Sequence, residues 1–189
     1  MPDIDIDCKN RDTILELFPY ISASIIKDNV IKKHNTGVYF HNIPIDPITK
    51  LSSIDYKEAN SRGYFKIDLL NVSVYEKVKN EEHLDKLLST EPNWELLEHW
   101  DIVKNLFQIS SPNTFEIIKE KLPKSIDDLA ILIAVIRPPM RHLIKKDYKE
   151  IKKHIWDISE EQKKQGAFRK SHAYAYAHVL LIQMNLLLE

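Results

Sequence analysis

The first seven residues alternate between apolar and acidic side chains, in the order Met1-Pro2-Asp3-Ile4-Asp5-Ile6-Asp7. Because successive side chains of a β-strand point to opposite faces, this pattern predicts a strand with one apolar and one acidic face. Carboxylates crowded on one face repel one another, by roughly 1 kcal/mol or more per pair in a partly shielded site. The acidic face is therefore either a site for Mg²⁺ or Mn²⁺, which prefer carboxylate oxygens, or an edge strand whose charges discourage aggregation.

Further elements are expected before residue 90. Apolar residues at helical spacing predict a helix over 9–18, and Pro19 predicts a bend followed by a second short helix to residue 27. A polar turn over 32–37, a strand over 38–43 and a second acidic strand over 63–70 follow. In that last strand Lys66 and Asp68 share a face, so Asp68 faces the acidic side chains if the strand lies beside the first. A helix over 74–88 closes this part.

From residue 91 onward the pattern is helical, with breaks marked by proline. We expect helices over 94–100, 114–122, 126–137, 145–165 and 171–188. The chain is therefore predicted to be α+β, with a strand-bearing region over 1–90 and an all-helical region over 91–189.

Net charge, glycine and cysteine content and the length of apolar runs limit the kinds of function that the chain can have. The chain has 189 residues and a net charge of −1, so any grip on nucleic acid must come from local patches rather than bulk charge. Its three glycines exclude a glycine-rich phosphate loop. The single cysteine excludes an internal disulfide and suits a reducing compartment. No apolar run reaches the roughly 20 residues that span a bilayer, and the N-terminus is acidic, so we expect a cytoplasmic protein with no membrane partner.

Two basic stretches in the second half could bind phosphate. The stretch over 141–153 gathers lysines on one helical face, which indicates either a solvated face or a patch for a phosphate backbone. In the second stretch, Ser171 is a favourable N-cap, which places Arg169, Lys170 and His172 at the positive end of the last helix. Cations there are misplaced unless an anion joins them, so this stretch is either a phosphate site or a helix start with exposed charges.

Several of these segments resemble the motifs of one family. Residues 2–7 followed by Arg11-Asp12 resemble the first catalytic motif of the bacterial replicative DNA polymerase III alpha subunit, of the C-family polymerases. The remaining segments occur in the family's order. They are Lys33-His34-Asn35-Thr36-Gly37-Val38, Phe65-Lys66-Ile67-Asp68-Leu69-Leu70, Leu106-Phe107-Gln108-Ile109-Ser110-Ser111, Ala134-Val135-Ile136-Arg137-Pro138 and Lys170-Ser171-His172-Ala173-Tyr174-Ala175-Tyr176-Ala177.

The resemblance implies a small nucleotidyltransferase-like palm sheet with helices, followed by an all-helical fingers-like region. It implies that Asp3, Asp5 and Asp68 bind two Mg²⁺ ions, or Mn²⁺ in their place, and are the catalytic carboxylates. Lys66 would lie beside them, and Arg169, Lys170 and His172 would bind the nucleotide. The implied reaction is attack of a primer 3′-hydroxyl on the α-phosphate of a dNTP, with primer-template DNA as partner.

The chain also departs from the family. The thumb has no counterpart, the arginine pair that helps hold the triphosphate has none, and Pro139 stands where the family has glycine. We expect another replication protein or a second copy of this chain to supply the missing contacts with DNA. The small size relative to the family suggests a phage-encoded version. The alternatives are a catalytically inactive polymerase-derived module that binds DNA or a partner, and a template-independent or gap-filling transferase.

Overall fold

The computed structural model describes residues 4–189 as two compact units. They are a sheet unit, Met1–Lys77, of which residues 4–77 are described, and a helical unit, Val78–Glu189. The fold is α+β, as the sequence predicted. Asp3 lies outside the described residues. The boundary between the two units follows Lys77, whereas the sequence pattern predicted it after residue 90.

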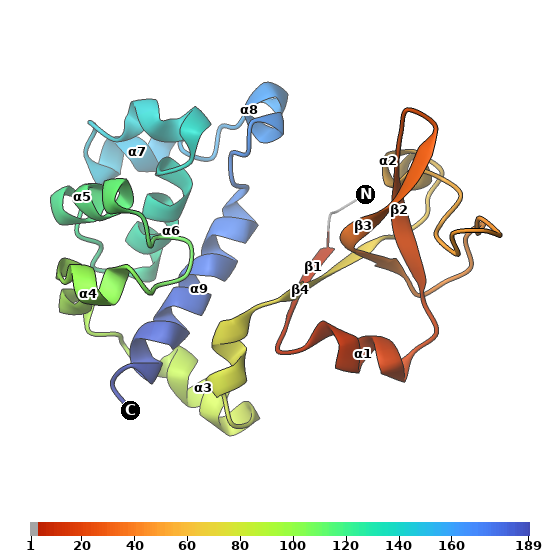
Figure 1. Cartoon of the computed structure of the whole chain (residues 1–189). Helices are drawn as coiled ribbons and strands as arrows, with labels where there is room; N and C mark the ends of the chain where they lie inside the picture. The colour runs from red at the N-terminus through yellow and green to blue at the C-terminus, as the bar shows by residue number, and fades with distance from the viewer. Residues whose placement is uncertain (1–3) are drawn as a thin grey trace. The chain divides into compact units, whose positions relative to one another are not determined.

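The sheet unit holds a four-stranded mixed sheet in the order β1-β4-β3-β2 (Figure 1). Its elements are β1 (Ile4–Cys8), α1 (Arg11–Leu17), β2 (Ile21–Lys27), β3 (Val30–Tyr39), α2 (Tyr56–Ser61), β4 (Ile67–Asn71) and the 3₁₀ turn η1 (Ser73–Lys77). β1 runs parallel to β4, and the other neighbours are antiparallel. On one side of the sheet Leu15 of α1 is buried with Val38 and Leu69. The unit is therefore held by an apolar face, as an alternating strand pattern requires.

The hairpin of β2 and β3 corrects the sequence prediction for residues 21–37. The second short helix predicted up to residue 27 is strand β2, and the polar turn predicted over 32–37 is the middle of β3. β3 ends at Tyr39, so the strand predicted over 38–43 is wrong beyond that residue. The turn itself is Asp28-Asn29, and both residues have positive φ, as two-residue hairpin turns require.

The helical unit is built from short helices around two long ones. Its elements are α3 (Glu81–Ser89), η2 (Trp94–Glu98), α4 (Trp100–Val103), α5 (Pro112–Glu120), α6 (Ile126–Val135), η3 (Pro138–Leu143), α7 (Tyr148–His154), α8 (Glu160–Lys164) and α9 (Lys170–Leu186). Side-chain caps start several of them, for example Ser111 on α5 and Ser125 on α6. The single helix predicted over 145–165 is two helices, because Ser159 and Gln162 form a capping box that starts α8. The helix predicted over 74–88 is likewise divided between η1 and α3.

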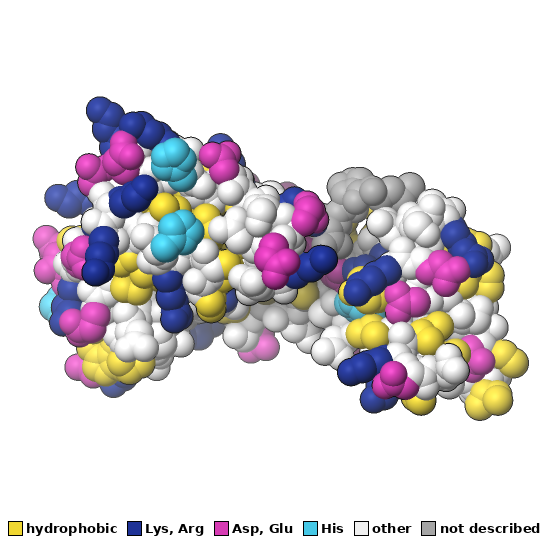
Figure 2. Space-filling model, turned by 90° about the horizontal axis from the view of Figure 1, so that it is seen from above, with side chains coloured by type: hydrophobic (Ala, Val, Ile, Leu, Met, Phe, Trp, Pro, Cys, Tyr) yellow, Lys and Arg dark blue, Asp and Glu magenta, His cyan; other side chains and the backbone are white. Residues whose placement is uncertain are grey.

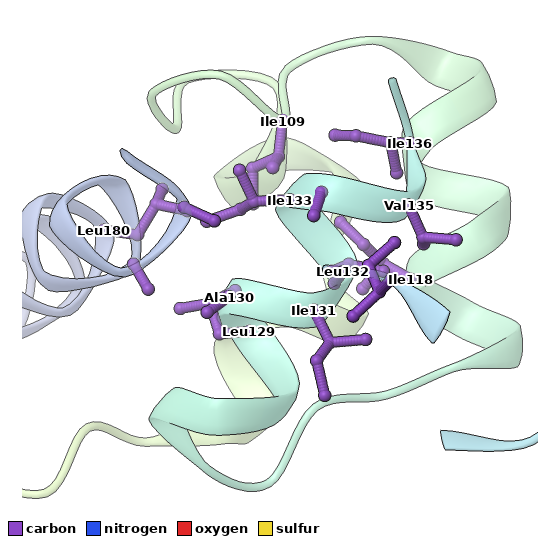
Figure 3. Close-up of a cluster of buried hydrophobic side chains, with 14 of the residues drawn as sticks. Ile109, Ile118, Leu129, Ala130, Ile131, Leu132, Ile133, Val135, Ile136 and Leu180 are labelled. Carbon is purple, nitrogen blue, oxygen red and sulfur yellow. The ribbon is translucent and has the colours of Figure 1, made fainter. Parts of the chain in front are cut away.

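The core of the helical unit surrounds α6, which is apolar on all its faces from Leu129 to Val135. Figure 3 shows Leu180 of α9 and Ile109 reaching toward its side chains. These residues belong to one buried cluster, in which Leu129 and Leu132 have no exposed surface. The residues that flank this core, including those after α6, are thereby fixed in position. Among residues 4–189, no helix is long and apolar enough to cross a membrane.

Candidate functional site

The parallel pairing of β1 with β4 brings two of the predicted carboxylates onto one face of the sheet. Asp5 lies opposite Asp68, while Ile4 pairs with Ile67 and Ile6 with Leu69. Side chains paired in this way point to the same face, so the aspartates share one face and the apolar residues the other. Asp5 is exposed, and Asp68 is buried with 8% of its surface exposed. The predicted pairing of the two acidic strands is confirmed.

Polar partners surround the buried carboxylate of Asp68. Its Oδ1 accepts a hydrogen bond of 2.8 Å from the hydroxyl of Thr36, on the neighbouring strand β3. Its Oδ2 accepts from the ammonium group of Lys66, two residues earlier and on the same face. Both side chains of this ion pair are only 11% exposed. A buried carboxylate is costly unless it is paired, so Lys66 balances the charge of Asp68 in the chain alone.

His34 lies next to this ion pair. Its Nδ1 accepts hydrogen bonds from the backbone N–H groups of Gly37, at 3.0 Å, and Thr36, at 3.4 Å. The same nitrogen lies 3.7 Å from Oδ1 of Asp68. His34 thus lies beside both Asp68 and the backbone that carries Thr36. His34 therefore shapes the local backbone that carries Thr36.

Gly37 of β3 lies in close contact with the side chains of Lys66 and His34. It pairs with Asp68 across the sheet. A Cβ atom on Gly37 would lie 2.7 Å from Cδ of Lys66 and 3.0 Å from Nδ1 of His34. The first distance is shorter than real Cβ contacts and the second is tight, so a side chain here would force the Lys66 chain to shift.

Tyr56 of helix α2 packs beside His34 and Lys66. Asp55 caps the helix and also accepts a hydrogen bond of 2.9 Å from the backbone N–H of Ile26, which fixes the helix start against β2. The ring of the next residue, Tyr56, lies edge-on to His34 with centroids 5.0 Å apart. The ammonium of Lys66 lies 5.8 Å from the centre of that ring, within cation–π range.

Asp5 and Asp68 carry the type of ligand atom that divalent metal ions such as Mg²⁺ bind. Asp5 and Asp68 offer hard oxygen ligands in register, and a cationic group already sits on Oδ2 of Asp68. Among residues 4–189, no group of three or more His, Cys, Asp or Glu side chains is placed to hold a metal ion. The sequence predicts Asp3 as the third ligand, and that residue lies outside the described part of the chain.

The predicted nucleotide-binding residues Arg169, Lys170 and His172 lie in the helical unit, at the start of α9. The helix begins at Lys170 with Arg169 as its N-cap, so the prediction of Ser171 as N-cap is wrong. In this described segment no side chain caps the helix end. A surface hollow of about 420 Å³ is lined by Lys170, Ser171 and Tyr174. Tyr174 is fixed there because its hydroxyl donates to Asp127 at 2.8 Å.

In the helical unit, His172 belongs to an aromatic cluster with Phe168 and Tyr176. Its ring meets that of Phe168 edge-on, with centroids 6.5 Å apart, and Phe168 also packs on Tyr176 at 5.2 Å. The guanidinium of Arg137 lies 3.7 Å from the centre of the Phe168 ring. Sequence reasoning assigned no role to Arg137 or Phe168. The motif resemblance at 134–138 was the available signal, and the contact itself depends on tertiary packing.

The predicted site residues therefore form two groups. Asp5, Lys66 and Asp68 gather on one face of the sheet unit, and Arg169, Lys170 and His172 follow one another at the start of α9 in the helical unit. Basic and acidic side chains are interspersed over the face of each unit seen in Figure 2, which agrees with the near-zero net charge. No protein-family model and no curated protein gives a significant match to the chain.

Proposed function

We propose that the chain is a nucleotidyltransferase of the DNA polymerase type, which joins a dNTP to a primer 3′-hydroxyl. One observation carries the proposal: Asp5 and Asp68 lie in register on neighbouring parallel strands, with Lys66 beside them. The order of motifs that resemble the polymerase III alpha subunit supports the same activity. The proposed partners are primer-template DNA and dNTP, with a replication protein or a second copy adding grip, and the proposed location is the cytoplasm.

In this proposal each group has a defined task. Asp3, Asp5 and Asp68 hold two Mg²⁺ ions, or Mn²⁺ in their place. When bound, the ions supply activation of the hydroxyl and stabilisation of charge on the phosphates. Thr36 keeps the Asp68 carboxylate in one orientation through its hydrogen bond. Arg169, Lys170 and His172 supply positive charge at a helix N-terminus for the triphosphate, whose oxygens suit free backbone N–H groups.

A second candidate function is a catalytically inactive module that binds DNA or a partner. The observation in its favour is that Lys66 already neutralises Asp68, so the buried carboxylate is stable without a metal ion.

A primer-extension assay with Mg²⁺ separates the candidates. Wild-type protein should extend a primed template, and Asp5→Asn or Asp68→Asn should lower the rate by roughly 100-fold or more, as expected when a group that stabilises transition-state charge is removed. Asp28→Asn is the matched control, because it removes the same charge at an exposed hairpin turn where asparagine is well tolerated.

The outcome assigns the function. Activity that persists in both aspartate variants contradicts the polymerase proposal, and folded, inactive wild-type protein that binds DNA favours the second candidate. Running the assay with a single strand and a gapped duplex beside the primed template tests the template-independent and gap-filling versions.

A further inference from the structure

Three segments that lie far apart in the sequence meet at Arg137, which directly follows the buried part of α6. Its Nη2 donates a hydrogen bond of 2.6 Å to the side-chain oxygen of Gln108. Its guanidinium stacks on Phe168, 3.7 Å from the ring centre. The three residues come from different parts of the helical unit and share no secondary structure element. Their contact is therefore a product of the fold.

The partners of Arg137 are held in place by the core. Gln108 has a φ of 64° and lies next to Ile109, which is fully buried. Gln183 of α9 clamps the same segment, because it accepts from the N–H of Phe107 at 2.8 Å and donates to the carbonyl of Asn105 at 2.9 Å. A left-handed backbone is unfavourable at a non-glycine residue and persists only where the surroundings impose it. The amide of Gln108 is thus presented to Arg137 by packing.

Among residues 4–189, Arg137 forms no ion pair that balances its charge. In the part of the chain that the structure describes, no carboxylate lies within ion-pair distance of it, and its buried Nε–H donates to nothing. Burial lowers the pKa of the guanidinium. Other cations of this unit have acidic partners, as Lys152 has in Asp127 and Lys104 in Asp101. A partly buried cation without a carboxylate and an unsatisfied N–H are both unfavourable, so an anionic partner would stabilise this site.

We propose that Arg137 and Gln108 form a binding site for a phosphate group. The guanidinium presents a planar fork of N–H donors that matches phosphate oxygens, and stacking on Phe168 fixes its plane. The amide oxygen of Gln108 already accepts from Arg137, and its NH₂ group is a further donor. His172, whose ring lies edge-on to Phe168, is a further polar group next to the stacked guanidinium. The phosphate belongs either to a nucleotide or to a nucleic-acid backbone.

Neither Arg137 nor Gln108 lies on the acidic sheet face, but His172 belongs to the proposed triphosphate site, so the nucleotide version of this inference rests on the proposed function. NMR of the arginine Nε–H groups in the full chain tests it directly. The resonance of Arg137 is identified by its loss in Arg137→Lys, and it should shift saturably when pyrophosphate is added at constant ionic strength. Titration with a dNTP and with a single-stranded oligonucleotide then distinguishes the two sources of phosphate by which one binds more tightly.

Calorimetry with pyrophosphate adds variants that keep the fold. Gln108→Glu supplies the missing carboxylate, so it should raise thermal stability and weaken pyrophosphate binding by about tenfold or more, as Arg137→Lys should. Lys145→Gln is the matched control, since Lys145 is an exposed cation of the same unit, eight residues away. Asp68→Asn should bind as wild type does, which separates this site from the catalytic proposal.

Two results would overturn the inference. One is an Arg137 resonance that none of the three phosphate compounds moves. The other is pyrophosphate binding that Lys145→Gln weakens as much as Arg137→Lys does, or that Gln108→Glu leaves intact. A purely structural Arg137 would give the first result, together with a lower melting temperature in Arg137→Lys.

Discussion

At the scale of single residues, Tyr39 connects burial near the acidic site to the pH dependence of stability. Its side chain is 1% exposed, and its hydroxyl has no hydrogen-bond partner among the described residues. Burial, with the charges of Asp55 and Asp68, raises the pKa of Tyr39 from 10.0 to about 12. The unfolded chain therefore loses this proton at lower pH than the folded chain, so the contribution to stability is complete below pH 10 and is lost as the pH rises toward 12.

Tyr39→Phe should remove this contribution. Between pH 10 and 12 the wild-type unfolding free energy should fall by about 2–3 kcal/mol more than that of the variant. At neutral pH the variant should be as stable as wild type or more so, because the unpartnered hydroxyl is gone. Urea unfolding at a series of pH values measures both, with the exposed Tyr20→Phe as control. Parallel curves for wild type and Tyr39→Phe would contradict the assignment.

The residues of the acidic face were predictable because their placement follows from local alternation. Asp5, Lys66 and Asp68 needed only the two-residue period of strands and one assumption, that the two strands pair. Arg137 and Phe168 could not be found in this way, since their contact depends on how α6 and α9 pack. His34 also escaped prediction, because its role is to accept backbone N–H groups inside a strand that reads as a polar turn.

At the scale of elements, the β2–β3 hairpin shows which local signals decide structure. Ser22, Ala23 and Ser24 are all buried in β2, so the strand lacks the alternation that would have revealed it. The middle of β3, residues 32–36, is polar on both faces, which resembles a turn in the sequence. The usable signal was Asp28-Asn29, a pair suited to a two-residue hairpin turn. The helix predicted over 126–137 begins at Ile126 as expected, whereas the one predicted over 114–122 begins two residues earlier, at Pro112, because Ser111 caps it.

Asn29→Gly should stabilise this hairpin. Asp28 and Asn29 have φ values of 52° and 60°, between Lys27 and Val30, which pair directly. Glycine adopts this conformation without steric cost, so we expect a gain of about 0.5 kcal/mol in the unfolding free energy. Asn29→Ala should instead lose about 1 kcal/mol, because its Cβ is strained there. Urea unfolding of the two variants tests the turn, and an alanine variant at least as stable as the glycine variant would contradict it.

At the scale of the whole molecule, the two units have separate cores of different size. The helical unit is built on one large buried cluster around α6, whereas the buried residues of the sheet unit form small groups, such as Cys8 with Leu15, Val38 and Leu69. Since apolar burial provides most of the driving force for folding, the helical unit should be the more stable of the two. The change in composition near residue 90 revealed that two parts exist, because a helix-only pattern replaces strand alternation there.

The chain carries a natural reporter in each unit. Cys8, its only cysteine, is 4% exposed in the sheet unit, and burial raises the pKa of its thiol, so it should resist thiol reagents while that unit is folded. The three tryptophans, Trp94, Trp100 and Trp156, all lie in the helical unit. In a urea titration at constant pH, Cys8 should become reactive at a lower concentration than that at which tryptophan fluorescence changes. Coincident midpoints would mean that the chain unfolds as one cooperative body, because probes of a two-state transition agree.

The variant Leu132→Ala, which weakens the core of the helical unit, is the control. It should lower the urea midpoint of the tryptophan signal and leave the Cys8 midpoint in place, since Leu132 lies wholly within the helical core.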